Sequence, residues 1–235
     1  MPNRTACAIL VAAVLGLWPA GAAAQLIAQP VVSGLTQPVA FVQDPSDSTV
    51  QMVVQQDGRI RVLKGGVLQT TDYLDLRSVV QDAGEQGLLG FAFAPDYATS
   101  GRVYVLFVDF SNREVVSRFV RSSTNPLRAD AATRFDFLWP GGQRYIAHPF
   151  ANHWGGNMVF GPHGYLYIGL GDGGSGDDPM HNAQNPQLLL GKMIRIDVSV
   201  PASDIEGYDI PATNPFVGLP GVLGEIWSFG LRNPW

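Results

Sequence analysis

One pattern of strands and turns recurs along the chain and limits the folds that it can adopt. An apolar strand leads to a Pro-Asp or Pro-His-Gly turn, a second strand rich in Tyr and Val follows, and then a third. Comparable first strands begin near positions 39, 88, 156 and 225. A spacing of roughly 50–70 residues is typical of propeller blades with inserted loops. Because one strand signature repeats, the sequence predicts an all-β fold of blades around a channel rather than a sandwich.

The composition agrees with many turns and few long helices. The 235 residues include 27 Gly and 17 Pro, and glycine is well above its usual share of about 7%. Asp-Gly and Gly-Gly pairs flank short alternating runs such as 59–63, which is typical of hairpins. The best helix candidate is short, near 185–190.

The strand that starts at Glu225 is expected to open a fourth blade. Three blades and one further strand cannot close a propeller, and closure is what protects the edges of its sheets. We therefore expect about three blades plus the start of a fourth, as the front portion of a longer protein.

Residues 1–24 have the features of a secretory signal peptide. One positive charge in Met1–Arg4 precedes the apolar run Ala6–Trp18, and Ala22–Ala24 supplies a cleavage site. The alternative, a membrane anchor, needs about 20 apolar residues, more than this run offers. Cleavage leaves residues 25–235 as a propeller domain in the periplasm or the medium. The single cysteine, Cys7, leaves with the signal peptide, so disulfides cannot hold the mature chain.

The charge pattern excludes one class of partner. Lys and Arg total 15 against 20 Asp and Glu, and no basic run occurs. A surface that follows phosphates needs clustered positive charge, so we expect no binding of nucleic acid. No segment after the signal peptide is long and apolar enough to span a membrane.

His153 is the main catalytic candidate. It lies in the stretch NHWGG, just before a predicted strand, where glycines let the backbone approach a ligand closely. Imidazole is the natural general base near neutral pH. The alternative is a surface or packing histidine. Of the others, His163 is expected to be solvated in its turn, and His148 and His181 have no distinguishing context.

Three carboxylates lie on the glycine-rich loop 171–179, namely Asp172, Asp177 and Asp178. Oxygen ligands on flexible backbone suit Ca²⁺, and a solvated loop is the alternative. One match to a calcium-binding nonapeptide occurs at 173–178, but that fold needs stacked copies, so we reject it.

Two further polar groups flank predicted strands. Glu85 enters the second blade, and Arg232 with Asn233 follows the last strand. An Arg beside an Asn can clamp an anionic ligand by charge and hydrogen bonds. Either group can equally tie neighbouring blades together.

These stretches, taken in order, resemble the soluble PQQ-dependent sugar dehydrogenases, which include the aldose sugar dehydrogenases and the glucose/sorbosone dehydrogenases. The resemblance covers the chain from about Gly34 to Trp235. It rests on five motifs: EQGLLGFAFAPDY (85–97), NHWGGNMVFGPHGYLYIGLGDGG (152–174), NAQNPQLLLGKMIRIDV (182–198), NPFVG (214–218) and EIWSFGLRNPW (225–235).

The resemblance implies a six-bladed β-propeller that binds pyrroloquinoline quinone (PQQ) on its axis, with a Ca²⁺ that holds and polarises the quinone. His153 would take the proton of the sugar's anomeric hydroxyl as hydride moves to PQQ. The implied substrate residues are Glu85, Asn152 and Asp177, and the implied PQQ residues are Arg232 and Asn233. The family's other PQQ and Ca²⁺ ligands belong to later blades, so this chain alone is expected to be inactive.

Two positions depart from the best-known glucose-oxidising members. Asn152 stands where those have Asp, and Glu85 stands where they have Gln. A neutral Asn cannot raise the basicity of His153 as a carboxylate would, so we expect a different sugar or a weaker base. The aldose, the electron acceptor and the oligomeric state are left open.

The same motifs also resemble the propeller of hedgehog-interacting-type proteins, which are extracellular binding modules without sugar oxidation. Fold alone does not decide between these functions. The signal peptide and the absence of disulfides favour the enzyme. PQQ-binding basic residues in later blades would discriminate between the two.

Overall fold

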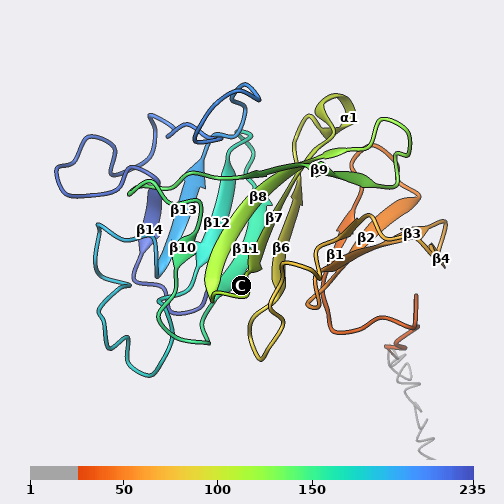
Figure 1. Cartoon of the computed structure of the whole chain (residues 1–235), viewed down its shortest axis with the longest axis horizontal. Coiled ribbons are helices and arrows are strands. Elements are labelled where there is room, and N and C mark those ends of the chain that lie inside the picture. The colour runs from red at the N-terminus through yellow and green to blue at the C-terminus, as the bar shows by residue number, and fades with distance from the viewer. Residues whose placement is uncertain (1–25) are drawn as a thin grey trace, which may run out of the picture. The chain divides into compact units, whose positions relative to one another are not determined.

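The strands of the computed structural model form three antiparallel sheets that follow one another along the chain (Figure 1). The structure describes residues 26–235, so the predicted signal peptide lies outside the described residues. Residues 26–31 have no regular secondary structure, and Val32–Trp235 forms one unit. Within that unit the predicted all-β class is confirmed, because its one helix, α1 (Tyr97–Ser100), has four residues.

The first two sheets have five strands each. In the first, the order is β1-β2-β3-β4 with β5 on β3; the strands are β1 (Pro38–Gln43), β2 (Val50–Gln55), β3 (Arg59–Lys64), β4 (Val67–Leu68) and β5 (Leu74–Asp75). In the second, the order is β10-β8-β7-β6 with β9 on β8; the strands are β6 (Leu88–Phe93), β7 (Arg102–Val108), β8 (Arg113–Arg121), β9 (Ala129–Asp136) and β10 (Ile146–Ala147).

The third sheet corrects the prediction of a fourth blade. Its order is β11-β12-β13-β14, with strands β11 (Gly155–Phe160), β12 (Leu166–Leu170), β13 (Lys192–Ile196) and β14 (Ile226–Phe229). The last strand was expected to open a new blade, but it pairs antiparallel with β13, with Ile194 opposite Ile226. A long loop brings the chain back, so β14 completes the third sheet.

The prediction of a helix near 185–190 is also wrong. This stretch forms turns, in which the side chain of Asn185 accepts a hydrogen bond from the backbone N–H of Gln187 at 3.0 Å. Such local bonds compete with those of a helix, and Pro186 has no N–H to contribute. No helix within residues 26–235 is long and apolar enough to cross a membrane.

The central strands of the second sheet are buried on both faces. Along β7, Val105 and Phe107 join the core shared with the first sheet, whereas Tyr104 and Leu106 join the core shared with the third. Alternate side chains of a strand point to opposite faces, so an unbroken apolar strand fits between two neighbouring sheets.

The first strand of each sheet lies at an edge of that sheet, and β6 contacts both β1 and β11. This contact leaves no room for a side chain at Gly90, where a Cβ atom would overlap the carbonyl oxygen of Gly156. The backbone of Gly90 is not left-handed, so its requirement for glycine is steric. The close approach of β6 and β11 sets the geometry of the loops that precede them.

Gly90→Ala is therefore expected to lower the free energy of unfolding by about 1–3 kcal/mol, as overpacking of a full site does. Gly176→Ala is the matched control, because a Cβ atom there would meet nothing within 4 Å. Urea denaturation compares the two variants with the parent protein. Equal stability of both variants would show that β6 and β11 are not in close contact.

Candidate active site

His153 lies on the loop between β10 and β11 and is held in an unusual conformation. Its φ is 64° and its side chain is 2% exposed. A left-handed conformation is uncommon for a residue other than glycine and needs support from its surroundings. Part of that support is Gly171, where a Cβ atom would overlap the His153 carbonyl oxygen.

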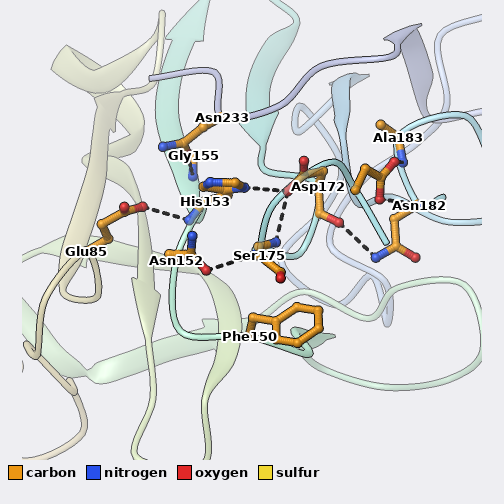
Figure 2. A network of polar contacts seen from close by, with 12 residues as sticks. Glu85, Phe150, Asn152, His153, Gly155, Asp172, Ser175, Asn182, Ala183 and Asn233 are labelled. Carbon is orange, nitrogen blue, oxygen red and sulfur yellow. Dashed lines mark hydrogen bonds and ion pairs between the residues drawn. The ribbon is translucent and has the colours of Figure 1, made fainter. Parts of the chain in front are cut away.

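A buried carboxylate orients the His153 ring. Nδ1 of His153 lies 2.8 Å from Oδ1 of Asp172, which is 3% exposed (Figure 2). Because the carboxylate is an acceptor, Nδ1 carries the proton and Nε2 keeps its lone pair. This arrangement leaves Nε2 able to accept a proton, and the carboxylate stabilises the imidazolium that results.

Asp172 is itself fixed by the loops on either side. Its Oδ1 also accepts the backbone N–H of Gly174 at 2.9 Å, and its own N–H donates to the Arg232 carbonyl at 2.9 Å. Its carbonyl accepts a hydrogen bond from the side-chain amide of Asn182 at 2.8 Å. The carboxylate therefore has little freedom to leave the histidine.

The role of Asp172 was missed in the sequence, which suggested it only as a metal ligand. The replacement of a carboxylate by Asn152 led us to expect a different sugar or a weaker base, and the structure adds that Asp172 supplies a carboxylate to His153 from elsewhere. The Asn152 side chain instead accepts the N–H of Ser175 at 3.0 Å. The pairing of β11 with β12 is the feature from which this contact could have been predicted. Gly155 pairs with Leu170, so residues 153 and 172 lie opposite each other just beyond the strands.

Glu85 connects the second sheet to the loop that carries His153. Its Oε2 accepts the backbone N–H of His153 at 2.7 Å. The Gln56 side chain holds the loop of Glu85 by donating to the carbonyls of Gly84 at 2.7 Å and Gln86 at 2.6 Å. Glu85 is exposed, and its other oxygen has no hydrogen-bond partner among the described residues.

Arg232 and Asn233 lie against the same loop from the third sheet. The Asn233 side-chain oxygen accepts the N–H of Gly155 at 2.8 Å, so Asn233 ties the chain after β14 to the start of β11. The exposed guanidinium of Arg232 makes no hydrogen bond or ion pair with any residue in the described range. Its five donors are available to an anionic group.

The three aspartates proposed for Ca²⁺ do not form a metal site. No three His, Cys, Asp or Glu side chains converge within residues 26–235. The two oxygens of Asp178 accept the backbone N–H groups of Asn182 and Ala183, both at 2.9 Å. Asp172 is committed to His153, and Asp177 is exposed. Ca²⁺ ligation needs several free oxygens around one point, so this loop does not fit the ion.

His148, for which the sequence suggested no role, packs within the loop that carries His153. Its ring stacks on Trp154 with centroids 3.7 Å apart. Its Nδ1 lies 2.7 Å from the Phe150 carbonyl oxygen and its Nε2 lies 3.3 Å from the His153 carbonyl oxygen. Burial lowers its pKa. His163 and His181 are exposed.

Comparison with known proteins decides the family. The family model of glucose/sorbosone dehydrogenases matches residues 35–235. The chain belongs to this family. It is 32% identical over 151 residues to aldose sugar dehydrogenase YliI of Escherichia coli, covering 64% of this chain and 37% of that protein. It is also 31% identical over 223 residues to the Hedgehog-interacting protein of Mus musculus, covering 89% of this chain and 31% of that protein.

Solved structures show the same propeller fold. The soluble aldose sugar dehydrogenase of Escherichia coli, in its apo form, superposes with a TM-score of 0.65 at 28% identity, covering 85% of this chain and 52% of that one. The PQQ-bound aldose sugar dehydrogenase of Streptomyces coelicolor gives 0.63 at 27% identity, covering 87% and 54%. The chain thus spans about half of these dehydrogenases and about a third of the Hedgehog-interacting proteins.

The contact between Glu85 and His153 can be tested without any substrate. Glu85→Ala removes the acceptor of the His153 N–H, so hydrogen exchange at this amide should accelerate, with a loss of about 1 kcal/mol in stability. Glu85→Gln keeps an acceptor oxygen and should exchange more slowly than Glu85→Ala. Unchanged exchange at His153 in Glu85→Ala would show that the contact does not form.

Proposed function

We propose that this chain belongs to an oxidoreductase that oxidises the anomeric C1 hydroxyl of an aldose to the lactone, with PQQ as hydride acceptor. The observation that carries the proposal is the buried pair of His153 and Asp172, at 2.8 Å. A histidine oriented by a carboxylate is an arrangement of a general base, and membership of a dehydrogenase family gives that base a reaction.

The described residues fit part of a PQQ site. PQQ is an anionic tricarboxylate, and the Arg232 guanidinium is exposed and without a protein partner among the described residues. The Asn233 amide nitrogen is similarly available, since only its oxygen is used, by Gly155. When bound, PQQ supplies a quinone that accepts two electrons as hydride. In this proposal, any Ca²⁺ binds residues outside the 171–179 loop.

His153 carries the proton transfer in this proposal. Oxidation of the sugar would break two bonds. The hydrogen of the C1–H bond would leave as hydride, and the proton of the O–H bond would pass to Nε2 of His153. The lactone and the imidazolium of His153 would result, with bound PQQ as the acceptor of the hydride, and Asp172 would stabilise the positive charge of that imidazolium. Glu85 holds the backbone of His153 in place during the transfer.

The sugar is proposed to lie over the same loops. The second carboxylate oxygen of Glu85 can accept a sugar hydroxyl, and the Asn152 amide nitrogen can donate to one, because only its oxygen is engaged, by Ser175. Asp177 is exposed on the adjoining loop. The predicted signal peptide would place this reaction in the periplasm or outside the cell.

A binding module is the second candidate, because 89% of this chain aligns with a Hedgehog-interacting protein. Such a role would need no base and no quinone. It would leave the hydrogen bond between His153 and Asp172 as a structural tie between loops. PQQ binding and aldose oxidation separate the two candidates.

The test expresses the complete reading frame that encodes this chain, adds PQQ and Ca²⁺, and assays aldoses with an artificial electron acceptor. His153→Ala should abolish turnover and leave PQQ binding largely intact. Asp172→Asn should lower kcat by about 10²-fold or more, because it removes the charge that orients and stabilises the base. His163→Ala, in an exposed turn, should retain full activity.

Two outcomes would contradict this proposal. Absence of both aldose oxidation and a PQQ-induced absorbance change would favour the binding module. Turnover that survives in His153→Ala would show that another group is the base.

A further inference from the structure

Lys192 is a fully buried cation that the proposed reaction does not use. It begins β13, and its relative exposure is 0%. Its ammonium donates to three backbone carbonyls: Leu190 at 2.7 Å, Asn182 at 2.8 Å and Ala183 at 3.1 Å. No carboxylate of the described residues forms an ion pair with it. All three N–H groups are therefore satisfied by backbone oxygens.

Such a group is costly to bury, so its presence needs a reason. Burial lowers the pKa of Lys192 to about 8, and the nearby charge of Asp178 partly opposes this effect. At neutral pH the side chain is still largely protonated. A neutral side chain without N–H donors would avoid the cost of burying a charge, but it would leave three buried carbonyl oxygens without a donor. The ammonium is therefore of use as the group that holds these carbonyls together.

One of the three carbonyls belongs to Asn182, which also contacts Asp172 of the His153–Asp172 pair. Asn182 accepts from Lys192 through its carbonyl and donates through its side-chain amide to the carbonyl of Asp172 at 2.8 Å. Asp172 in turn accepts from Nδ1 of His153. Figure 2 shows Asn182, Asp172 and His153 in this order.

The same segment is held from its other side by a carboxylate. Asp178 accepts the N–H groups of Asn182 and Ala183, so that the backbone at 182–183 lies between a carboxylate on its N–H side and an ammonium on its carbonyl side. The peptide group that joins Asn182 to Ala183 is held at both ends, because its C=O accepts from Lys192 and its N–H donates to Asp178. Reversal of this peptide group would place like poles together.

We propose that Lys192 is a positioning residue, an internal cation that organises the 171–183 loop and thereby keeps Asp172 opposite His153. A bound Ca²⁺ was the sequence-based hypothesis for this loop, and the ammonium takes the corresponding structural role. The proposal rests on the proposed function only for the consequence in catalysis. The geometry of His153 can be measured without any sugar or quinone.

The test uses the protein expressed from the complete reading frame and labelled with ¹⁵N-histidine. NMR of this protein distinguishes the Nδ1–H from the Nε2–H form of His153. Lys192→Ala should lose the Nδ1–H form that is bonded to Asp172. The sequence contains one other lysine, Lys64, which is exposed. Lys64→Ala should leave the His153 signals unchanged and is the matched control.

Chemical rescue separates the charge from the volume of the side chain. Lys192→Ala lacks the atoms of propylammonium, so added propylammonium should restore the Nδ1–H signal of His153. Propanol, which is similar in size but neutral, and tetramethylammonium, which has no N–H, should not restore it. Equal rescue by propanol would show that Lys192 only fills space and would overturn the proposal.

Lys192→Met provides a second variant if Lys192→Ala fails to fold. Methionine keeps most of the length but has neither charge nor donors, so the Nδ1–H form of His153 should again be lost. Retention of this form in a folded Lys192→Met would also overturn the proposal. If aldose oxidation is absent from the parent protein but the NMR results hold, the proposed function fails and the role of Lys192 stands.

Discussion

The hydrogen bond between Nδ1 of His153 and the carboxylate of Asp172 is the interaction around which the candidate site is arranged. Both groups are buried, and water cannot replace either partner at low cost. The left-handed backbone at His153 and the close passage of Gly171 are what bring the two loops to this distance. Contacts from the second sheet, through Glu85, and from the chain after β14, through Asn233, converge on the same loop.

Much of the fold could be predicted from local sequence patterns. Short apolar runs bounded by Asp-Gly and Gly-Gly turns predicted the strands, and their recurrence predicted consecutive sheets. The pairing of β14 with β13 could not be predicted from the sequence. The sequence of β14 is typical of the first strand of a blade, and the path of the long loop before it decides which sheet it joins. The turns at 185–190 were missed because side-chain bonds of Asn185 compete with a helix.

The candidate site was predictable where one residue type carries the chemistry and unpredictable where a partner is needed. His153 could be singled out from its glycine-rich context. Its carboxylate partner lies 19 positions later and is found only from the register of β11 against β12. The three backbone carbonyls that bind Lys192 are harder still to predict, because backbone carbonyls leave no signature in a sequence. Asp172 and Asp178 suggested a metal site because acidic residues in a loop have the same composition whether they bind an ion or cap backbone N–H groups.

Relatives of this chain include both dehydrogenases and Hedgehog-interacting proteins, so shared blades do not by themselves establish chemistry. The most direct measurement is single-turnover reduction of bound PQQ, followed by absorbance, with an aldose carrying hydrogen or deuterium at C1. Transfer of hydride from C1 with His153 as base predicts reduction that is slower with deuterium and lost in His153→Ala. Normal PQQ binding without reduction by any aldose, or reduction that is unaffected by His153→Ala, would contradict it.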